Sequence, residues 1–307
     1  MKPTFKNIQQ LANNFKDESV CREYLAQQRW NGKPVCPYCA NENIWNIENG
    51  KRYKCATCKK KFSVTVGTIM QDSNVPLSKW FIAIYICTSH KKGISSLQLH
   101  RDLGITQKSA WHMIHRIREM VRQKNPSIFA GTVQADESFF GGKNKNRHND
   151  KKIKESQGRS VKDKTAVFGL LSDGKVNTEV VPDTKAKTLK PIITAMVEQG
   201  AIMVTDEWGA YNGLSKNFQH EVINHKKGEY VRDGFSTNGL EGFWSLFKRG
   251  VYGIYHSTSK QHLHRYCDEF SFRYNTRNIE ENERFNLALT KCETTLPYKQ
   301  LIQKNAK

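Results

Sequence analysis

A glutamate and a lysine stand seven residues apart in the segment 238–249, which reads Asn-Gly-Leu-Glu-Gly-Phe-Trp-Ser-Leu-Phe-Lys-Arg. Apolar residues recur at positions 240, 243 and 247, a spacing that predicts a helix with one apolar stripe. Seven residues make about two helical turns, so Glu241 and Lys248 leave the helix on one face, with Asn238 near it. A carboxylate can hold a divalent metal ion and a lysine can hold a phosphate, so this face is a candidate site for phosphate chemistry.

Two further acids lie upstream, because two apolar, strand-like segments end at Asp136 and at Asp206. Alternation along a strand puts Asp136 and Glu137 on opposite faces, so only one of that pair can serve a shared site. Asp206 and Glu241 are separated by 34 residues. Three acids arranged in this way, in a very basic chain, suggest metal-assisted phosphoryl transfer on nucleic acid. Each acid alone has a plainer interpretation, since aspartate at a strand end is commonly a turn or cap residue.

Four of the eight cysteines form two Cys-x-x-Cys pairs, Cys36 with Cys39 and Cys55 with Cys58, and 15 residues separate the pairs. This spacing is typical of a four-thiolate zinc ribbon, with a redox-active or unliganded pair as the alternative. Four protein ligands leave no open coordination position, so the zinc is expected to be structural. Basic residues flank the second pair and suggest contact with DNA: Lys51, Arg52, Lys54, Lys59, Lys60 and Lys61.

Residues 94–118 contain two short helical patterns around Gly104. Ser95 and Thr106 are natural N-caps for the two helices. The pattern predicts a helix-turn-helix whose second helix enters a DNA groove, although an ordinary helical hairpin gives the same pattern. Histidines on that helix are possible metal ligands, but a surface or DNA-facing position is the simpler interpretation. The residues that the second helix would present to DNA are Gln107, Lys108, Trp111, His112 and His115.

The remaining sequence supplies the elements that must position these groups. We expect an N-terminal helix over residues 1–30, the zinc ribbon over 31–66 and a helical, helix-turn-helix-like region over 67–125. Residues 128–280 alternate strands and helices, and residues 281–307 are expected to be a loosely held tail. Between 143 and 164, nine Lys/Arg stand against three Asp/Glu, which predicts a solvated loop or a DNA contact.

Composition bounds the function. The 307-residue chain carries a formal net charge of +20 and has a pI of about 9.6, which favours a polyanionic partner, above all nucleic acid. No apolar run approaches the length of a membrane span, and the N-terminus lacks the apolar core of a signal peptide. The scattered cysteines fit a reducing compartment. We therefore expect a cytoplasmic protein, associated with the nucleoid, that makes no membrane contact.

The order strand, hairpin, helix, strand, with acids ending the first and last strands, is similar to the ribonuclease H fold. The whole pattern resembles the DDE transposases of bacterial insertion sequences, in the ISXO-like group with an N-terminal zinc ribbon. That resemblance covers about residues 20–280. It rests on the ribbon cysteines, Ala135-Asp136-Glu137, Thr205-Asp206-Glu207-Trp208, His225 with Tyr230, Thr237-Asn238 through Arg249, and Arg273-Tyr274-Asn275-Thr276-Arg277.

The resemblance implies an activity and a set of roles. Asp136, Asp206 and Glu241 would hold two Mg²⁺ ions, for which Mn²⁺ would substitute, and Lys248 with its neighbour Arg249 would contact DNA phosphate. Some relatives use an asparagine as the third residue, which would fall on Asn238. The implied reaction is cleavage of double-stranded DNA at the terminal repeats of the element and strand transfer into target DNA, by a homodimer or higher oligomer.

Three alternatives stay open at this point. Asn238 as N-cap and Glu241 three residues later also fit a capping box without any chemistry. A DNA-binding regulator would use the ribbon and the helix-turn-helix while its large domain only dimerises. A ribonuclease H-like nuclease would cleave DNA without joining it.

Overall fold

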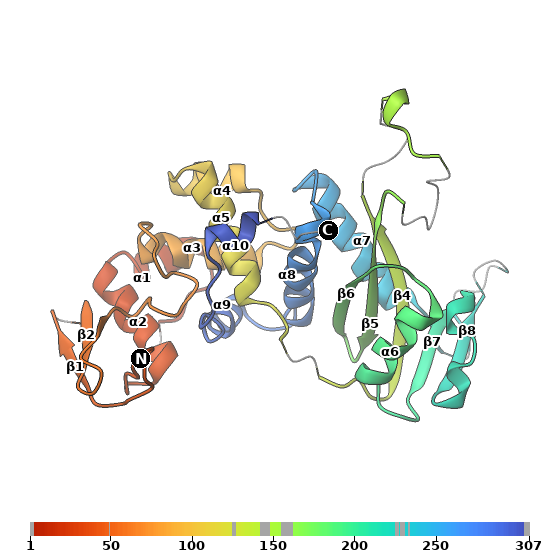
Figure 1. Ribbon diagram of the computed structural model, residues 1–307, viewed down its shortest axis with the longest axis horizontal. Coiled ribbons are helices and arrows are strands. Elements are labelled where there is room, and N and C mark those ends of the chain that lie inside the picture. The colour runs from red at the N-terminus through yellow and green to blue at the C-terminus, as the bar shows by residue number, and fades with distance from the viewer. Residues whose placement is uncertain are drawn as a thin grey trace. The chain divides into compact units, whose positions relative to one another are not determined.

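The computed structural model describes residues 3–48, 50–124, 127–141, 148–154, 162–224, 227, 231–232 and 234–303. His225 and Tyr230, and most of the basic segment 143–164, lie outside the described residues. The chain forms two compact units (Figure 1). The first comprises residues 1–122 and 276–307, and the second comprises residues 123–275.

The first unit consists of helices and a small three-stranded sheet. Its strands pair antiparallel in the order β1-β2-β3. They are β1 (Ile44–Ile47), β2 (Arg52–Cys55) and β3 (Lys61–Phe62). Its helices are α1 (Ile8–Asn14), α2 (Glu18–Trp30), α3 (Leu77–Ser89), α4 (Ser96–Leu103), α5 (Gln107–Met120), α9 (Glu281–Leu289) and α10 (Tyr298–Ile302).

An aromatic cluster joins the two ends of the chain within this unit. The ring of Phe285 on α9 lies 5.4 Å from that of Phe5, 6.2 Å from Phe15 and 5.6 Å from Phe81. Buried aromatic rings supply much of the apolar area that holds such a core together. The expectation of a loose tail over 281–307 is therefore wrong for its described part, since α9 and α10 belong to this core. The single helix expected over 1–30 is two helices, because the chain turns between Phe15 and Asp17.

The helical pair α4–α5 has the predicted local structure. The Ser95 side chain accepts a hydrogen bond from the backbone N–H of Gln98, and Thr106 accepts one from Ser109. Both residues therefore cap their helices as expected. Gly104 ends α4 at φ 57°, a left-handed conformation that glycine adopts without strain.

The second unit is built on a mixed five-stranded sheet in the order β6-β5-β4-β7-β8. The strands β4, β5 and β6 pair antiparallel, while β7 pairs parallel with both β4 and β8. The bounds are β4 (Thr132–Phe140), β5 (Thr165–Ser172), β6 (Lys175–Val181), β7 (Ile202–Asp206) and β8 (Gln219–Ile223). The turn of the β5–β6 hairpin is formed by Asp173 and Gly174, both at positive φ.

Three helices cover the two faces of this sheet: α6 (Ala186–Met196), α7 (Asn238–Gly253) and α8 (Leu263–Asn275). Leu189 and Ile193 of α6 pack on one face, where Val133, Ala135 and Met203 are buried. The opposite face is covered by α7 and α8 (Figure 1). A second cluster of buried side chains lies there and includes Val167, Leu171, Leu240, Phe243, Phe247 and Phe270.

The side chain of Asn275, at the end of α8, ties that helix to the sheet. Its amide oxygen accepts from the backbone N–H of Val176 at 2.7 Å, and its amide nitrogen donates to the Val176 carbonyl at 2.8 Å. No helix among the residues described in either unit combines the length and the apolarity needed to cross a bilayer.

Candidate active site and zinc centre

The zinc-ribbon cysteines converge as their spacing predicts. Sγ of Cys36 lies 3.6 Å from that of Cys58, and Cys39 and Cys55 are equally far apart. All four sulfur atoms lie within 4.8 Å of one another. A tetrahedral zinc ion with Zn–S bonds of about 2.3 Å places its sulfur atoms about 3.8 Å apart. The four thiols therefore fit a closed, structural zinc site.

Asp136 and Asp206 lie on neighbouring parallel strands and in the same register. Thr132, Val133 and Gln134 pair with Ile202, Met203 and Val204, so the same offset sets Asp136 beside Asp206. Val133, Ala135 and Met203 point into the core beneath α6, so alternation directs both aspartates to the face that carries α7. Adjacent strands are about 4.8 Å apart, which brings the two carboxylates close together.

One detail of the strand prediction is wrong. β4 does not end at Asp136 but continues to Phe140, because its pairing with β5 extends to Phe140 and Thr165. Asp206 does end β7, and its Oδ1 accepts a hydrogen bond from the backbone N–H of Trp208 at 3.0 Å. The aspartates thus lie where the β4–β7 ladder stops rather than at two strand ends.

Glu137 faces away from Asp136, as alternation requires, and it has a buried partner that the sequence did not reveal. The hydroxyl of Tyr211 donates a hydrogen bond to the Glu137 carboxylate. Burial raises the pKa of Tyr211 well above its usual value, and the negative charges of Glu137, Asp136 and Asp206 raise it further. Tyr211 therefore stays neutral beside these three carboxylates. A tyrosine in a Gly-rich segment gives no pattern from which this role could be predicted.

Helix α7 is seated directly on the strand that carries Asp136. The backbone N–H of Leu240 donates to Oε1 of Gln134 at 2.9 Å. Gly169 pairs with Asp136 across the β4–β5 ladder, and a Cβ atom at Gly169 would lie 2.7 Å from the Trp244 ring. Only glycine at this position of β5 allows the indole of Trp244 to approach that strand so closely. A glycine inside a buried strand is the sequence signal from which such an approach could be predicted.

The N-terminus of α7 differs from the expected capping box. The N-cap position is Thr237, and Asn238 is the first helical residue. The Thr237 hydroxyl donates to Oε1 of Glu241 at 2.9 Å instead of bonding a backbone N–H. The capping-box alternative is wrong in its positions, because a box needs the N-cap side chain to accept from the helix backbone. Asn238 and Glu241 are both exposed, three residues apart on one face.

Lys248 lies two turns along α7 and close enough to Asp136 for their charges to interact. Burial lowers the pKa of Lys248, the Asp136 carboxylate opposes that shift, and the neighbouring Lys164 adds to it. The next residue, Arg249, is exposed. One edge of α7 therefore brings positive charge to the strand that carries Asp136.

The described side chains of Asp136, Asp206 and Glu241 do not form one cluster. Among the described residues, the four cysteines form the one set of three or more metal-ligating side chains whose ligand atoms lie close enough to share an ion. Asp136 and Asp206 are neighbours by register, whereas the Glu241 carboxylate is bonded to Thr237. The described side chains therefore do not bring Glu241 into one ligand cluster with the two aspartates.

The predicted DNA-facing residues of α5 make contacts within their own unit. Gln107 bonds Ser96, while the Lys108 ammonium lies 4.8 Å from the ring centroid of Tyr298. The rings of Trp111 and His112 also pack edge-on against Tyr298.

Two of these residues are less accessible than expected. Nε2 of His112 lies 2.9 Å from the Leu296 carbonyl, and burial lowers the pKa of this histidine. His115 is fully buried and packs against Trp111, so it cannot reach a groove in this conformation. It lies on the inner side of α5, where Ile114 and Arg118 are also buried.

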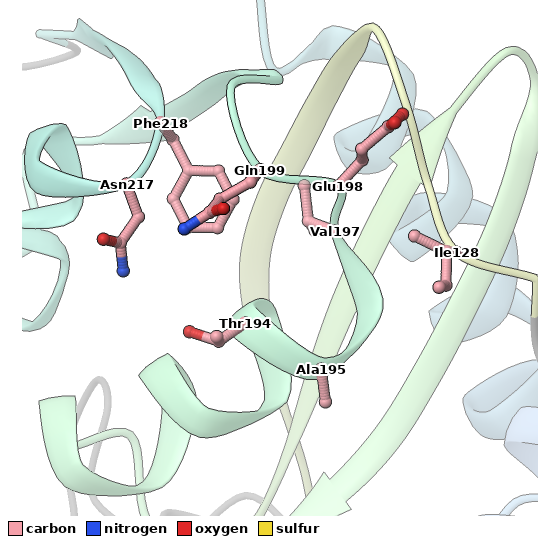
Figure 2. Close-up of a pocket in the computed structure, with 8 residues that line it drawn as sticks. All are labelled: Ile128, Thr194, Ala195, Val197, Glu198, Gln199, Asn217 and Phe218. Carbon is pink, nitrogen blue, oxygen red and sulfur yellow. The ribbon is translucent and has the colours of Figure 1, made fainter.

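A cavity in the second unit lies at the other end of the sheet from the acids. Its lining includes Val197 to Gln199, just before β7, and Asn217 and Phe218, just before β8 (Figure 2). These residues precede the strands, whereas Asp206 ends β7. Ligand sites in sheets of this kind commonly lie beyond the carboxyl ends of parallel strands. The cavity is thus separate from the candidate active site.

Comparison with known proteins agrees with this arrangement. Residues 128–275 match the ISXO2-like transposase domain, and residues 16–61 match the transposase zinc-ribbon domain. The first match coincides closely with the second compact unit, and the second match contains all four zinc-ribbon cysteines.

Two individual relatives agree with the family matches. An uncharacterized protein in transposable element ISH50 of Halobacterium salinarum is 28% identical over 273 residues, 84% of this chain and 91% of that protein. An uncharacterized transposase-like protein of Haemophilus influenzae is 33% identical over 107 residues, 34% of this chain and 85% of that protein. A pre-cleavage Mos1 transpososome matches at 12% identity and a TM-score of 0.28, over 66% of this chain and 75% of that chain, too weakly to support an inference. The chain belongs to the ISXO2-like family of insertion-sequence transposases and carries that family's zinc ribbon.

Proposed function

We propose that this transposase cleaves DNA at the ends of its element and transfers the freed strand into target DNA, with Mg²⁺ as cofactor. The observation that carries the proposal is the matched register of Asp136 and Asp206 on the sheet face beneath α7. Family membership supports transposition, and the side chains on this face supply the groups that the chemistry needs.

We also propose that the second unit has the ribonuclease H-like fold. Three antiparallel strands followed by two strands parallel to the first, in the spatial order β6-β5-β4-β7-β8, are consistent with this fold. The parallel strands β4 and β7 carry Asp136 and Asp206. Helix α7, on the sheet face to which these aspartates point, carries the third candidate ligand.

Asp136, Asp206 and Glu241 are the proposed magnesium ligands, because carboxylate oxygens suit this hard cation. The two aspartates each follow the paired segment of their strand by two residues, and Glu241 would join them by leaving Thr237. Asn238 is the alternative third ligand, since it lies on the same exposed face of the helix. When bound, two magnesium ions would activate the attacking hydroxyl and stabilise the leaving oxygen of an in-line displacement.

The residues of the chain then act by binding and by orientation. Lys248, whose charge interacts with that of Asp136, would hold a phosphate of the strand to be cut, and Arg249 would contact the backbone beside it. Water would attack first and free a 3′-hydroxyl, which would then attack target DNA without a covalent enzyme intermediate. Glu137 and Tyr211 hold the far side of β4 in place behind Asp136.

Double-stranded DNA is the proposed partner, and a homodimer or higher oligomer is the proposed active complex. The net charge of +20 supports contact with many phosphates. On α5, Gln107 and Lys108 are exposed, while Trp111 and His112 are half-buried and would need Tyr298 to move before they could reach bases.

The test is an assay of cleavage and joining on DNA that carries the inverted repeats flanking the coding sequence. Wild-type protein should cut and join with Mg²⁺ and do neither when Mg²⁺ is omitted. Asp136→Asn and Asp206→Asn should abolish both while DNA binding persists. Asp173→Asn is the matched control, because Asp173 is an exposed turn residue at φ 48° that asparagine also tolerates. Binding without any cleavage by the wild type would favour a regulator, and cleavage without joining would favour a nuclease.

A further inference from the structure

The three-stranded sheet of the zinc ribbon has two chemically different faces. On its inner face, the rings of Tyr53 and Phe62 stack at 5.6 Å. Trp30, at the end of α2, packs edge-on against both rings, 5.2 Å from Tyr53 and 6.2 Å from Phe62. Tyr53 and Phe62 are buried as a result, so these two rings hold the ribbon to the rest of its unit.

The opposite face carries one aromatic residue and a line of lysines. Trp45 pairs with Lys54 across β1 and β2, and Lys54 pairs with Lys61 across β2 and β3, so the three side chains form a row on one face. Trp45 is 49% exposed. The ammonium groups of Lys54 and Lys59 lie 5.6 and 5.5 Å from the centroid of its ring. We call Trp45, Lys54, Lys59 and Lys61 the outer face of the ribbon.

The positive charge of residues 51–61 exceeds the negative charge of the zinc centre. Residues 51–61 contain six Lys/Arg and no Asp/Glu. A zinc ion with four thiolates carries a net charge of about −2, which offsets two of the six. The Glu48 carboxylate Oε1 lies 3.8 Å from Nη1 of Arg52 and offsets a third positive charge. The remaining positive charge surrounds an exposed indole, and such charge favours a polyanion. A single exposed tryptophan would need no explanation, but a tryptophan ring close to two ammonium groups does.

We propose that the outer face of the ribbon docks on the backbone of double-stranded DNA, an inference that rests on the proposed function. The lysines contact phosphates, and the indole packs on the sugar edge between them. Single-strand platforms present successive aromatic residues on which successive bases stack. The outer face has one aromatic residue among three lysines, which fits backbone contact with a duplex better than base stacking. Such contacts position a protein on DNA without reading its sequence.

The experiment measures binding of the full-length protein, without Mg²⁺, to a duplex with the element end, to a random duplex and to a single strand of equal length. Salt is varied from about 50 to 200 mM. Trp45→Ala should weaken binding to both duplexes by about tenfold without changing the salt slope. Lys54→Gln and Lys61→Gln should each lower the slope by about 0.9, the value for one phosphate contact. Lys16→Gln, at an exposed lysine before α2 and outside the three-stranded sheet, is the matched control and should change neither.

Zinc content distinguishes a lost DNA contact from an unfolded ribbon. Each variant should bind as much zinc per chain as the wild type. Unchanged duplex affinity in a zinc-loaded Trp45→Ala protein would overturn the proposal, as would a loss confined to the single strand or a change in self-association alone. Cleavage is not part of this assay. A wild type that binds DNA but never cuts it would refute the proposed function and leave the comparison at Trp45 intact.

Discussion

Replacing Gly169 by alanine should displace helix α7 and thereby disturb the active site. The added methyl carbon would lie 2.7 and 3.1 Å from two ring atoms of Trp244 and 3.2 Å from a methyl group of Leu240. Carbon atoms prefer separations of about 3.5–4.0 Å, so the shortest contact is too close by about 1 Å. The Trp244 ring cannot move aside easily, because it is buried against Phe140 and Phe243.

The expected cost follows from overpacking of a filled core, which is about 1–3 kcal/mol. For a unit of this size, about 150 residues, 1 kcal/mol lowers the melting temperature by about 2–4 °C. Gly169→Ala should therefore lower it by about 2–12 °C. A shift of α7 by about 1 Å would move Glu241 and Lys248 away from Asp136 and could slow cleavage by about 100-fold.

Thermal unfolding and single-turnover cleavage measure the two effects. Gly253→Ala is the matched control, because it lies on the same helix with nothing within 4 Å of an added Cβ. Combining Gly169→Ala with Trp244→Phe should recover about 0.5–3 kcal/mol relative to the sum of the single changes, since the smaller ring makes room for the methyl group. If Gly169→Ala unfolds and cleaves like the wild type, α7 is not seated as described.

Three further predictions concern metal, salt and the buried acid. Metal analysis should return about one zinc per chain, and Cys58→Ser should lose it together with the folded ribbon; a zinc-free but fully folded wild type would contradict this. Affinity for duplex DNA should fall by about 10³–10⁵ between 50 and 200 mM salt if six to ten phosphates are contacted, whereas a flat response would remove the electrostatic argument. Tyr211→Phe should cost about 1–3 kcal/mol of stability, because the buried Glu137 carboxylate loses this donor, while Tyr38→Phe, at an exposed tyrosine, should unfold like the wild type.

Local patterns predicted those parts of the structure that depend on neighbours in the sequence. The cysteine pairs converge because each tight turn fixes two sulfur atoms, and the Asp173-Gly174 turn forms because both residues tolerate positive φ. Alternation correctly separated Asp136 from Glu137. It could not reveal that β4 continues past Asp136, since that extension depends on pairing with a strand about 30 residues away.

Features that depend on distant contacts were missed. Thr237 and Asn238 are both good N-cap residues, so sequence could not decide which one begins α7. Phe285 joins Phe5 and Phe15 in one cluster although about 270 residues separate them, and a polar C-terminal segment gives little indication of this. Likewise, Tyr298 covers Trp111 and His112 only because the chain returns to its N-terminal unit.

The most direct test of the account is DNA cleavage by Glu241→Gln. Glutamine keeps the size of the side chain and can still accept the hydrogen bond from Thr237, so the fold should persist. It removes the charge that two magnesium ions require, so cleavage should be abolished while DNA binding is retained. Glu179→Gln, at an exposed glutamate of β6, is the matched control and should cleave normally. Near-normal cleavage by a well-folded Glu241→Gln protein would contradict the assignment and make Asn238 the candidate third ligand.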